Sequence, residues 1–107
     1  MSKRKANSAT ILLRKHLREL SLAYNEEFKF HEDRRWRADF HLIDHRILLE
    51  ISGAVYVGGR HVRGKGYEAD CMKQNHATML GYRCLVFSTG QVLRGVARGF
   101  LEEHVCA

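Results

Sequence analysis

The sequence predicts an α/β domain in which the elements follow the order α-β-β-β-α-β-α, with a mixed four-stranded sheet flanked by helices. Apolar residues first recur at helical spacing, then alternate with polar residues in three consecutive segments, and finally form a helix–strand–helix pattern. A crossover through a helix to the fourth strand would make the sheet mixed. The 107 residues contain no proline and fit one domain with one modest core.

The first half of the chain supplies one helix and three strands. Residues 8–24 begin at the N-cap candidate Ser8. Their apolar positions are spaced as in a helix: Leu13, Leu17, Leu20 and Tyr24. The segment EFKFHE, residues 27–32, alternates phenylalanines with polar residues, as a half-buried strand does. Further strands are predicted over 36–43 and 46–52.

The second half supplies the crossover and the fourth strand. Residues 53–66 contain five glycines and several basic residues, which predicts a loop. Residues 67–80 predict a helix that ends at Gly81 and carries four larger side chains on one side: Met72, His76, Met79 and Leu80. Residues 82–88 predict a short apolar strand. In a single last helix, one stripe would hold Val92, Val96 and Phe100, away from Arg94 and Arg98.

The hairpin RADFHLIDHRILLEISG places two carboxylates inside apolar strands. With Asp44-His45 as a two-residue turn, Asp39 faces Glu50 across the strands, with Cβ atoms roughly 5 Å apart. At 4 Å and an effective dielectric near 20, their repulsion is on the order of 4 kcal/mol. A bound cation, a shared proton or a nearby arginine would offset it. The alternative is a surface Asp and Glu that each pair with an arginine such as Arg37.

Charge and cysteine content narrow the function classes. The net charge is +6 and the pI about 9.6, which suits a phosphate backbone as partner. Residues 1–7 are expected to form a basic, flexible tail. The apolar runs are too short for a membrane span. Three unevenly spaced cysteines without a CxxC pair favour neither a disulfide framework nor a zinc site, and fit the cytoplasm.

The hairpin resembles a known nuclease family. Asp39, ten intervening residues and Glu50-Ile51-Ser52 resemble the D…(D/E)xK core of the PD-(D/E)XK superfamily. The ordered segments WRADF, LLEISG, GGRHVRG and YEADCMKQNHATMLGYRCLVF are similar to small phage and bacterial endonucleases of that superfamily, including relatives of the very-short-patch repair group. The similarity spans about residues 27–88. It implies a restriction-endonuclease-like fold with an αβββαβ core.

The resemblance also implies the roles of individual residues. Asp39 and Glu50 would bind Mg²⁺ or Mn²⁺, with the backbone carbonyl of Ile51 as a third ligand. Two positions depart from the family pattern: Ala38 replaces the proline, and Ser52 replaces the motif lysine. Serine cannot carry the charge of lysine. Either another cation takes over, or catalysis is impaired.

Three residues are candidates for the missing lysine. Arg37 lies opposite Ser52 in the predicted register and would balance charge. Lys73 on the crossover helix would be a migrated cation of the kind that some relatives use. His61 in the glycine-rich loop has a side chain suited to proton transfer. For Lys73 the alternative is a solvated surface position, and for His61 a loop histidine that binds backbone or phosphate.

The sequence therefore predicts a metal-dependent DNA endonuclease in which a metal-activated water hydrolyses phosphodiester bonds. DNA would be gripped through its backbone by two basic clusters: Arg34, Arg35 and Arg37, and Arg60, Arg63 and Lys65. A homodimer would let two sites address two strands. The expected location is the cytoplasm of a bacterium or a phage-infected host. Two alternatives remain, a nuclease-like protein that binds DNA without cutting and an RNA-processing nuclease.

Overall fold

The computed structural model describes residues 7–53, 56–57, 60–61 and 65–106. Its elements, in chain order, are α1 (Ser8–Glu19), β1 (Tyr24–Lys29), β2 (Arg37–Leu42), the 3-10 turn η1 (Ile43–His45), β3 (Ile47–Ser52), β4 (Tyr56–Val57), β5 (Arg60–His61), α2 (Lys65–Met79), β6 (Arg83–Ser88), α3 (Thr89–Leu93) and α4 (Val96–His104). The predicted fold class is confirmed. Several details differ. The strand expected over residues 27–32 is β1, which covers Tyr24–Lys29. In addition, β4 and β5 form a small hairpin in the glycine-rich segment, and the last helix is split in two.

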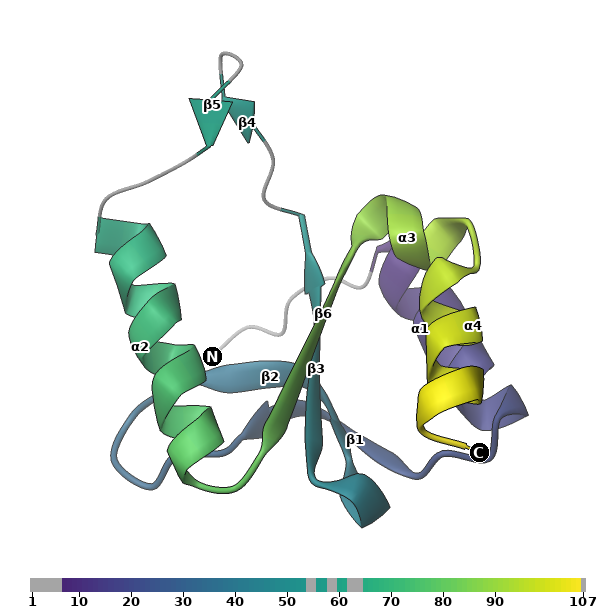
Figure 1. Cartoon of the computed structure of the whole chain (residues 1–107), viewed down its shortest axis with the longest axis horizontal. Coiled ribbons are helices and arrows are strands. Elements are labelled where there is room, and N and C mark those ends of the chain that lie inside the picture. Colours follow the sequence, from purple (N-terminus) through teal and green to yellow (C-terminus); the bar gives the residue numbers. More distant parts are fainter. Residues whose placement is uncertain (1–6, 54–55, 58–59, 62–64, 107) are drawn as a thin grey trace.

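The main sheet has the strand order β1-β2-β3-β6. β1, β2 and β3 form an antiparallel meander, and β6 lies parallel to β3, so the sheet is mixed as predicted. Helices α1, α3 and α4 lie on one side of the sheet and α2 lies on the other (Figure 1). Among the described helices, α2 is therefore the one that the crossover places over this face.

The register of the central hairpin is the predicted one, although its turn is not. The pairs are Phe40–Leu49, His41–Leu48 and Leu42–Ile47. The turn is longer than two residues, because η1 is followed by Arg46 in a left-handed conformation with φ 52°. The ladder also stops at Phe40–Leu49, so Asp39 and Glu50 do not pair through their backbones. Arg37 pairs with Lys29 of β1, not with Ser52.

The main core fills the space between the sheet and helices α1, α3 and α4. Alternation sends one set of strand side chains to this face: Phe40, Leu42, Ile47 and Leu49, with Ile51 at its margin. Leu13 and Leu17 of α1 and Leu101 of α4 meet them and are fully buried. In this core the predicted helical repeat of α1 holds at Leu13 and Leu17, whereas Leu20 is the C-cap residue and Tyr24 belongs to β1. The outward–inward pattern of β2 and β3 also holds.

A smaller cluster lies under α2. Its buried members are Phe30, Ala38, Leu48 and Ala77. Rings from the β1–β2 region and Tyr82 surround it, including His41, which stacks on Phe28 with ring centroids 4.1 Å apart. The four larger α2 side chains predicted to share one side do not form the packing face. Met79 is 85% exposed, Met72 and Leu80 are also exposed, and His76 is half-buried. Ala77 is the buried contact instead.

The helix boundaries differ from the predictions at several points. Helix α2 begins two residues early, at Lys65, and ends one residue early, at Met79. Asn7, not Ser8, caps α1 by accepting a hydrogen bond from the Thr10 N–H, so the predicted tail is shorter by one residue and the rest of it, 1–6, lies outside the described residues. α1 also ends at Glu19, five residues early. The last helix breaks at Gly95, whose φ of 83° is left-handed. This break turns the buried stripe of α4 onto Ala97 and Leu101, leaving two predicted members half-exposed: Val96 and Phe100.

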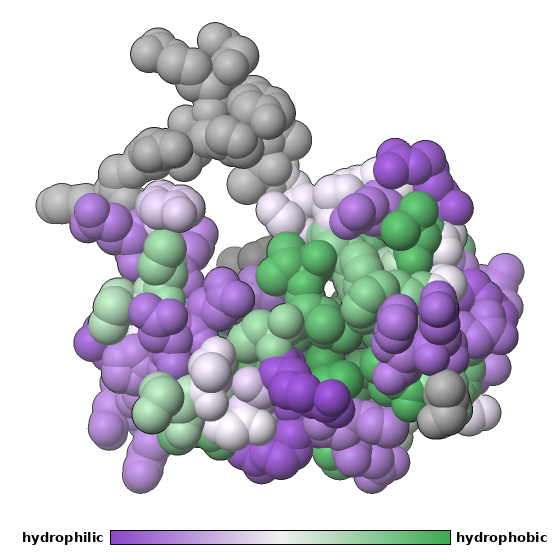
Figure 2. Space-filling view, in the orientation of Figure 1, coloured by the Kyte–Doolittle hydropathy of each residue, from purple (hydrophilic) through white to green (hydrophobic). Residues whose placement is uncertain are grey.

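Exposed apolar residues gather beside the edge strand β6. Val86, Leu93, Val96 and Phe100 are each between 38% and 55% exposed. Figure 2 shows apolar surface along the middle of the face on which β6 lies, with hydrophilic residues on either side. No helix among the described residues is both long and apolar enough to cross a membrane.

Candidate active site

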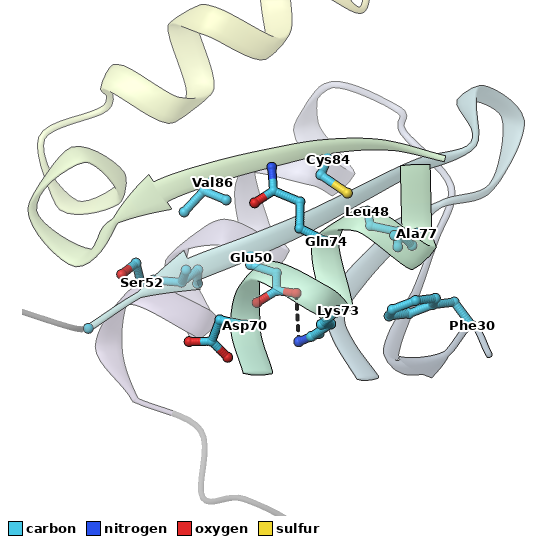
Figure 3. A pocket seen from close by; sticks show the side chains of 12 residues that line it. Phe30, Leu48, Glu50, Ser52, Asp70, Lys73, Gln74, Ala77, Cys84 and Val86 are labelled. Carbon is cyan, nitrogen blue, oxygen red and sulfur yellow. Dashed lines mark ion pairs between the residues drawn. The ribbon is translucent and has the colours of Figure 1, made fainter. Parts of the chain in front are cut away.

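A cleft of about 400 Å³ opens between α2 and the neighbouring strands β3 and β6. Its walls come from the residue after β1, from β3 and the residue after it, and from α2 and β6. The lining residues are Phe30, Leu48, Glu50, Ile51, Ser52, Gly53, Asp70, Lys73, Gln74, Ala77, Cys84 and Val86. The charged side chains gather at one end, and Phe30 and Ala77 lie at the other (Figure 3). The cleft is thus polar at one end and apolar at the other.

The polar end is organised by an ion pair between Glu50 of β3 and Lys73 of α2. The Lys73 Nζ lies 2.8 Å from the Glu50 Oε2, and the two side chains are 20% and 36% exposed (Figure 3). Glu50 points to the α2 face because it alternates with Leu49, which enters the main core. Lys73 therefore supplies a cation beside one of the two predicted carboxylates.

The second carboxylate, Asp39, is fixed by the backbone of β3. The Ile51 N–H donates a hydrogen bond of 2.8 Å to the Asp39 Oδ2. This donor is available because the β2–β3 ladder ends at Phe40–Leu49. Asp39 does not line the cleft, but this hydrogen bond joins it to Ile51, which lines the cleft. The two carboxylates thus sit on neighbouring strands, one paired with a lysine and one with a backbone amide.

Helix α2 brings three polar residues to the cleft. Asp70, Lys73 and Gln74 line it, and they are spaced by three and four residues, which places them on one helix face with Ala77. The sequence reading identified Lys73 but gave Asp70 no role. The same spacing is the signal that could have found it. The sequence predicts another side of α2 as the packing side, because the buried face of a helix is usually apolar and these three side chains are polar.

The apolar end has a floor of buried carbon atoms and one thiol. Leu48 and Ala77 are almost fully buried, and Phe30 is 8% exposed. Burial raises the pKa of the Cys84 thiol, and the negative charge of Glu50 adds to this effect. Cys84 is therefore a neutral thiol near pH 7 and behaves as a small apolar side chain. Cys84 and the three apolar residues were not identified as site residues from the sequence, because they read as ordinary core.

The other predicted site residues are spread around this cleft. Ser52, at the motif lysine position, lines the polar end. Arg60 and His61 belong to β5, and Lys65 begins α2. The side chains of these three residues are outside the described part of the structure, and so is the whole of Arg63. The structure therefore leaves the roles predicted for them untested.

The Arg34–Arg37 cluster lies in the connection from β1 into β2. The Arg34 guanidinium carbon sits 4.9 Å from the centre of the Trp36 ring, a cation–π contact. Arg35 is exposed. Trp36 stacks near Phe30, with ring centroids 6.3 Å apart, so the cluster adjoins the apolar end of the cleft. Trp36 is thus mainly a packing residue.

The donor set of the polar end fits a hard divalent cation. Within residues 7–53, 56–57, 60–61 and 65–106, no group of three or more His, Cys, Asp or Glu side chains is arranged to hold a metal. The described residues therefore do not form a metal site in which every ligand is a protein side chain. Mg²⁺ commonly takes one or two carboxylates and completes its shell with water and substrate phosphate. Asp39 and Glu50 meet that smaller requirement.

Comparison with known proteins supports the fold. No family model matches the chain, and no curated protein matches it. Among solved structures, the catalytic domain of the homing endonuclease I-Bth0305I superposes with a TM-score of 0.65 at 16% sequence identity, covering 94% of this chain and 99% of that domain. The match extends over nearly the full length of both chains. The chain therefore has the fold of a homing endonuclease catalytic domain.

Proposed function

We propose that the protein is a metal-dependent DNA endonuclease of the PD-(D/E)XK type in which Lys73 replaces the motif lysine. The observation that carries the proposal is the 2.8 Å ion pair between Lys73 and Glu50 in a cleft beside Asp39. An acidic pair with an adjacent lysine is the side-chain set of the superfamily motif, in which the lysine follows the second acidic residue on the same strand. Here the cation comes from α2, while Ser52 occupies its usual position. The fold shared with a nuclease domain supports this reading.

Asp39, Glu50 and the Ile51 carbonyl would hold Mg²⁺ or Mn²⁺. A bound divalent ion neutralises a phosphodiester and lowers the pKa of an attacking water. The protein's own contribution is orientation and charge. The Ile51 N–H fixes the Asp39 carboxylate, and Lys73 places a positive charge where negative charge develops on the phosphate. Ser52 offers a hydroxyl for hydrogen bonding, and His61 is proposed as a proton-transfer group.

DNA binding would rest on phosphate contacts. The net charge of +6 favours a polyanion. Arg34, Arg35 and Arg37 adjoin one end of the cleft, and Arg60, Arg63 and Lys65 follow β3 in the chain. Such contacts grip any sequence and weaken with salt. A homodimer would address two strands, and sedimentation with and without DNA would reveal it. The proposed setting is a bacterial or phage-infected cytoplasm.

The test is cleavage of single-stranded, duplex, flap and four-way-junction DNA with Mg²⁺ or Mn²⁺. Asp39→Ala and Glu50→Ala should each abolish cleavage and leave DNA binding largely intact. Asp44→Ala, which removes an exposed carboxylate in the hairpin turn, is the matched control and should cut normally. Cleavage at the wild-type rate by both site variants would refute the site. Binding without any metal-dependent cleavage by the wild type would instead establish a non-cutting DNA-binding protein.

A further inference from the structure

The cleft extends past the residues that metal binding and phosphate contact would use. Metal binding and phosphate contact involve its polar end, near Glu50, Ser52 and Lys73. Duplex DNA presents phosphates and sugars to a protein that follows its backbone. Nothing in that surface matches the apolar end, which is formed by four residues: Phe30, Leu48, Ala77 and Cys84. This apolar end is therefore available to a second part of the substrate.

The apolar end offers a preformed apolar surface beside the polar end. The whole cleft, at about 400 Å³, falls within the roughly 300–1,000 Å³ typical of small-molecule sites. Its floor is rigid, because Leu48 and Ala77 are buried and the Phe30 ring is held by neighbouring rings of Trp36 and Tyr82. A preformed apolar surface of this kind suits an aromatic ring, and in DNA the aromatic rings are the bases.

Gln74 adds a polar group between the two ends. Its side chain extends over the cleft between Glu50 and Cys84 (Figure 3). A glutamine amide carries both a donor and an acceptor, which matches the hydrogen-bonding edge of a base. Among the described residues, no hydrogen-bond partner occupies the Gln74 amide. The amide can therefore contact a bound ligand without breaking an internal bond.

We propose that the apolar end of the cleft binds one unstacked nucleobase beside the phosphodiester bond that is cut. This inference rests on the proposed nuclease function and names its substrate class, DNA with an unpaired nucleotide at the cleavage position. Taking a base out of a paired stack is costly, and the cost is least where the base is already mismatched or unpaired. The two ends of one cleft then hold the base and the phosphate of neighbouring nucleotides.

The experiment compares three duplexes of equal length that differ at one position. The first is fully paired, the second contains one unpaired nucleotide, and the third contains an abasic residue in place of that nucleotide. Affinity is measured in Ca²⁺ and cleavage in Mg²⁺, with cut positions mapped on a sequencing gel. The unpaired nucleotide should raise affinity about tenfold or more, in line with base stacking on a protein surface. It should draw cuts to its own position, and the abasic duplex should lose the gain.

Two cleft variants and two matched controls locate the effect. Gln74→Leu removes the amide, and Cys84→Leu fills the apolar end. Both should bring the unpaired and paired duplexes to within about threefold of each other in affinity. The controls are Asn75→Leu, at the residue that follows Gln74 in α2, and Cys71→Leu, at a half-buried cysteine in the same helix. Neither control residue lines the cleft, and both controls should keep the preference. Thermal melts check that each variant folds. Gln74→Leu is the variant less expected to disturb folding, because Gln74 is exposed.

The outcomes separate the two proposals. Equal affinity and cleavage for all three duplexes would overturn the nucleobase site and leave the nuclease standing. A preference that survives in both cleft variants, or in the abasic duplex, would also overturn it, because flexibility of the backbone would then explain the gain. A base-dependent affinity that both cleft variants lose, in a protein that cuts no DNA, would uphold the nucleobase site and overturn the nuclease.

Discussion

The two faces of the main sheet are built from different chemistry. The face under α1, α3 and α4 is a continuous apolar core, in which Leu13, Leu17, Leu49 and Leu101 are fully buried. The face under α2 carries an ion pair, a cleft and a smaller cluster of rings. Neighbouring residues of one strand serve both, since Leu49 enters the core and Glu50 faces the cleft. The first face can supply stability, which leaves the second free to hold charged groups that a core would exclude.

The largest expected effect is a loss of cleavage activity at the α2 face without a matching loss of stability. Lys73→Met removes the cation beside Glu50 and should lower metal-dependent cleavage by about 10²-fold or more, the scale of one lost electrostatic contact in a transition state. The free energy of unfolding should change by less than about 1 kcal/mol, because the pair is part-exposed. Lys15→Met, an exposed lysine of α1, is the control. An unchanged cleavage rate would remove Lys73 from the mechanism.

A core substitution should give the opposite result. Leu49→Ala leaves a cavity in the face under α1, α3 and α4, and should lower the free energy of unfolding by about 2–5 kcal/mol. Val86→Ala on the neighbouring strand β6 should cost less than about 1 kcal/mol, because Val86 is 55% exposed. Urea unfolding of the two variants measures both values. Similar losses would show that the two faces contribute equally to stability.

Two histidines, one in α1 and one in β2, link the free energy of unfolding to pH. Burial lowers the pKa of His16 in α1 and of His41 in β2. Each therefore binds fewer protons in the folded than in the unfolded state, so the free energy of unfolding should fall as the pH drops below about 6.5, the ordinary histidine pKa. The Nδ1 of His16 is buried without a partner among the described residues, whereas His41 lies between two rings.

Replacing each histidine shows how much it contributes. His16→Leu and His41→Leu should each flatten the decline of unfolding free energy with falling pH, and thermal melts between pH 5 and pH 8 measure it. Asn75→Leu, which replaces an exposed side chain that has no titratable group, is the control and should leave the decline as it is. A slope unchanged in both His16→Leu and His41→Leu would place the acid sensitivity elsewhere.

The smallest effects concern one capping device on each face. The Arg46 Nη2 donates to the Leu80 carbonyl at 2.6 Å, which fastens the end of α2 to the hairpin. Ser88 and Gln91 form a capping box at the start of α3. Arg46→Met and Ser88→Ala should each lower the free energy of unfolding by about 1 kcal/mol. Arg18→Met, an exposed position on α1, should change it little. A larger loss at Arg46 would mean that α2 depends on this anchor more than α3 depends on its cap.

The sequence predicted the sheet well because strand alternation is a local signal. Phe40, Leu42 and Leu49 go to one face and His41 to the other, as the period of two requires. The break at Gly95 was missed, since the apolar spacing of the last helix continues across it. The packing side of α2 was missed for a different reason. It depends on contacts with residues far away in the chain: Ala77 packs in the cluster with Phe30 and Leu48, and Lys73 pairs with Glu50.

The candidate site was predicted in part. The two carboxylates and Lys73 were identified, but their geometry depends on tertiary contacts. The predicted backbone pairing of Asp39 with Glu50 does not form, and the bond from the Ile51 N–H to Asp39 replaces it. The length of the ladder could not be read from residue types. The cleft could not be predicted either, because Phe30 and Cys84 become site residues only through the space that remains between β6 and α2.

The parallel pairing of β3 with β6 has a consequence for how the protein folds. The meander of β1, β2 and β3 joins strands that are close in the chain, so it can form early. Pairing such as Glu50–Val86 closes a much longer loop. Until α2 has docked, the two acidic side chains stand together without Lys73. High salt screens this repulsion and should therefore speed refolding, whereas in Glu50→Gln, which has no charge to screen at that position, the refolding rate should depend less on salt.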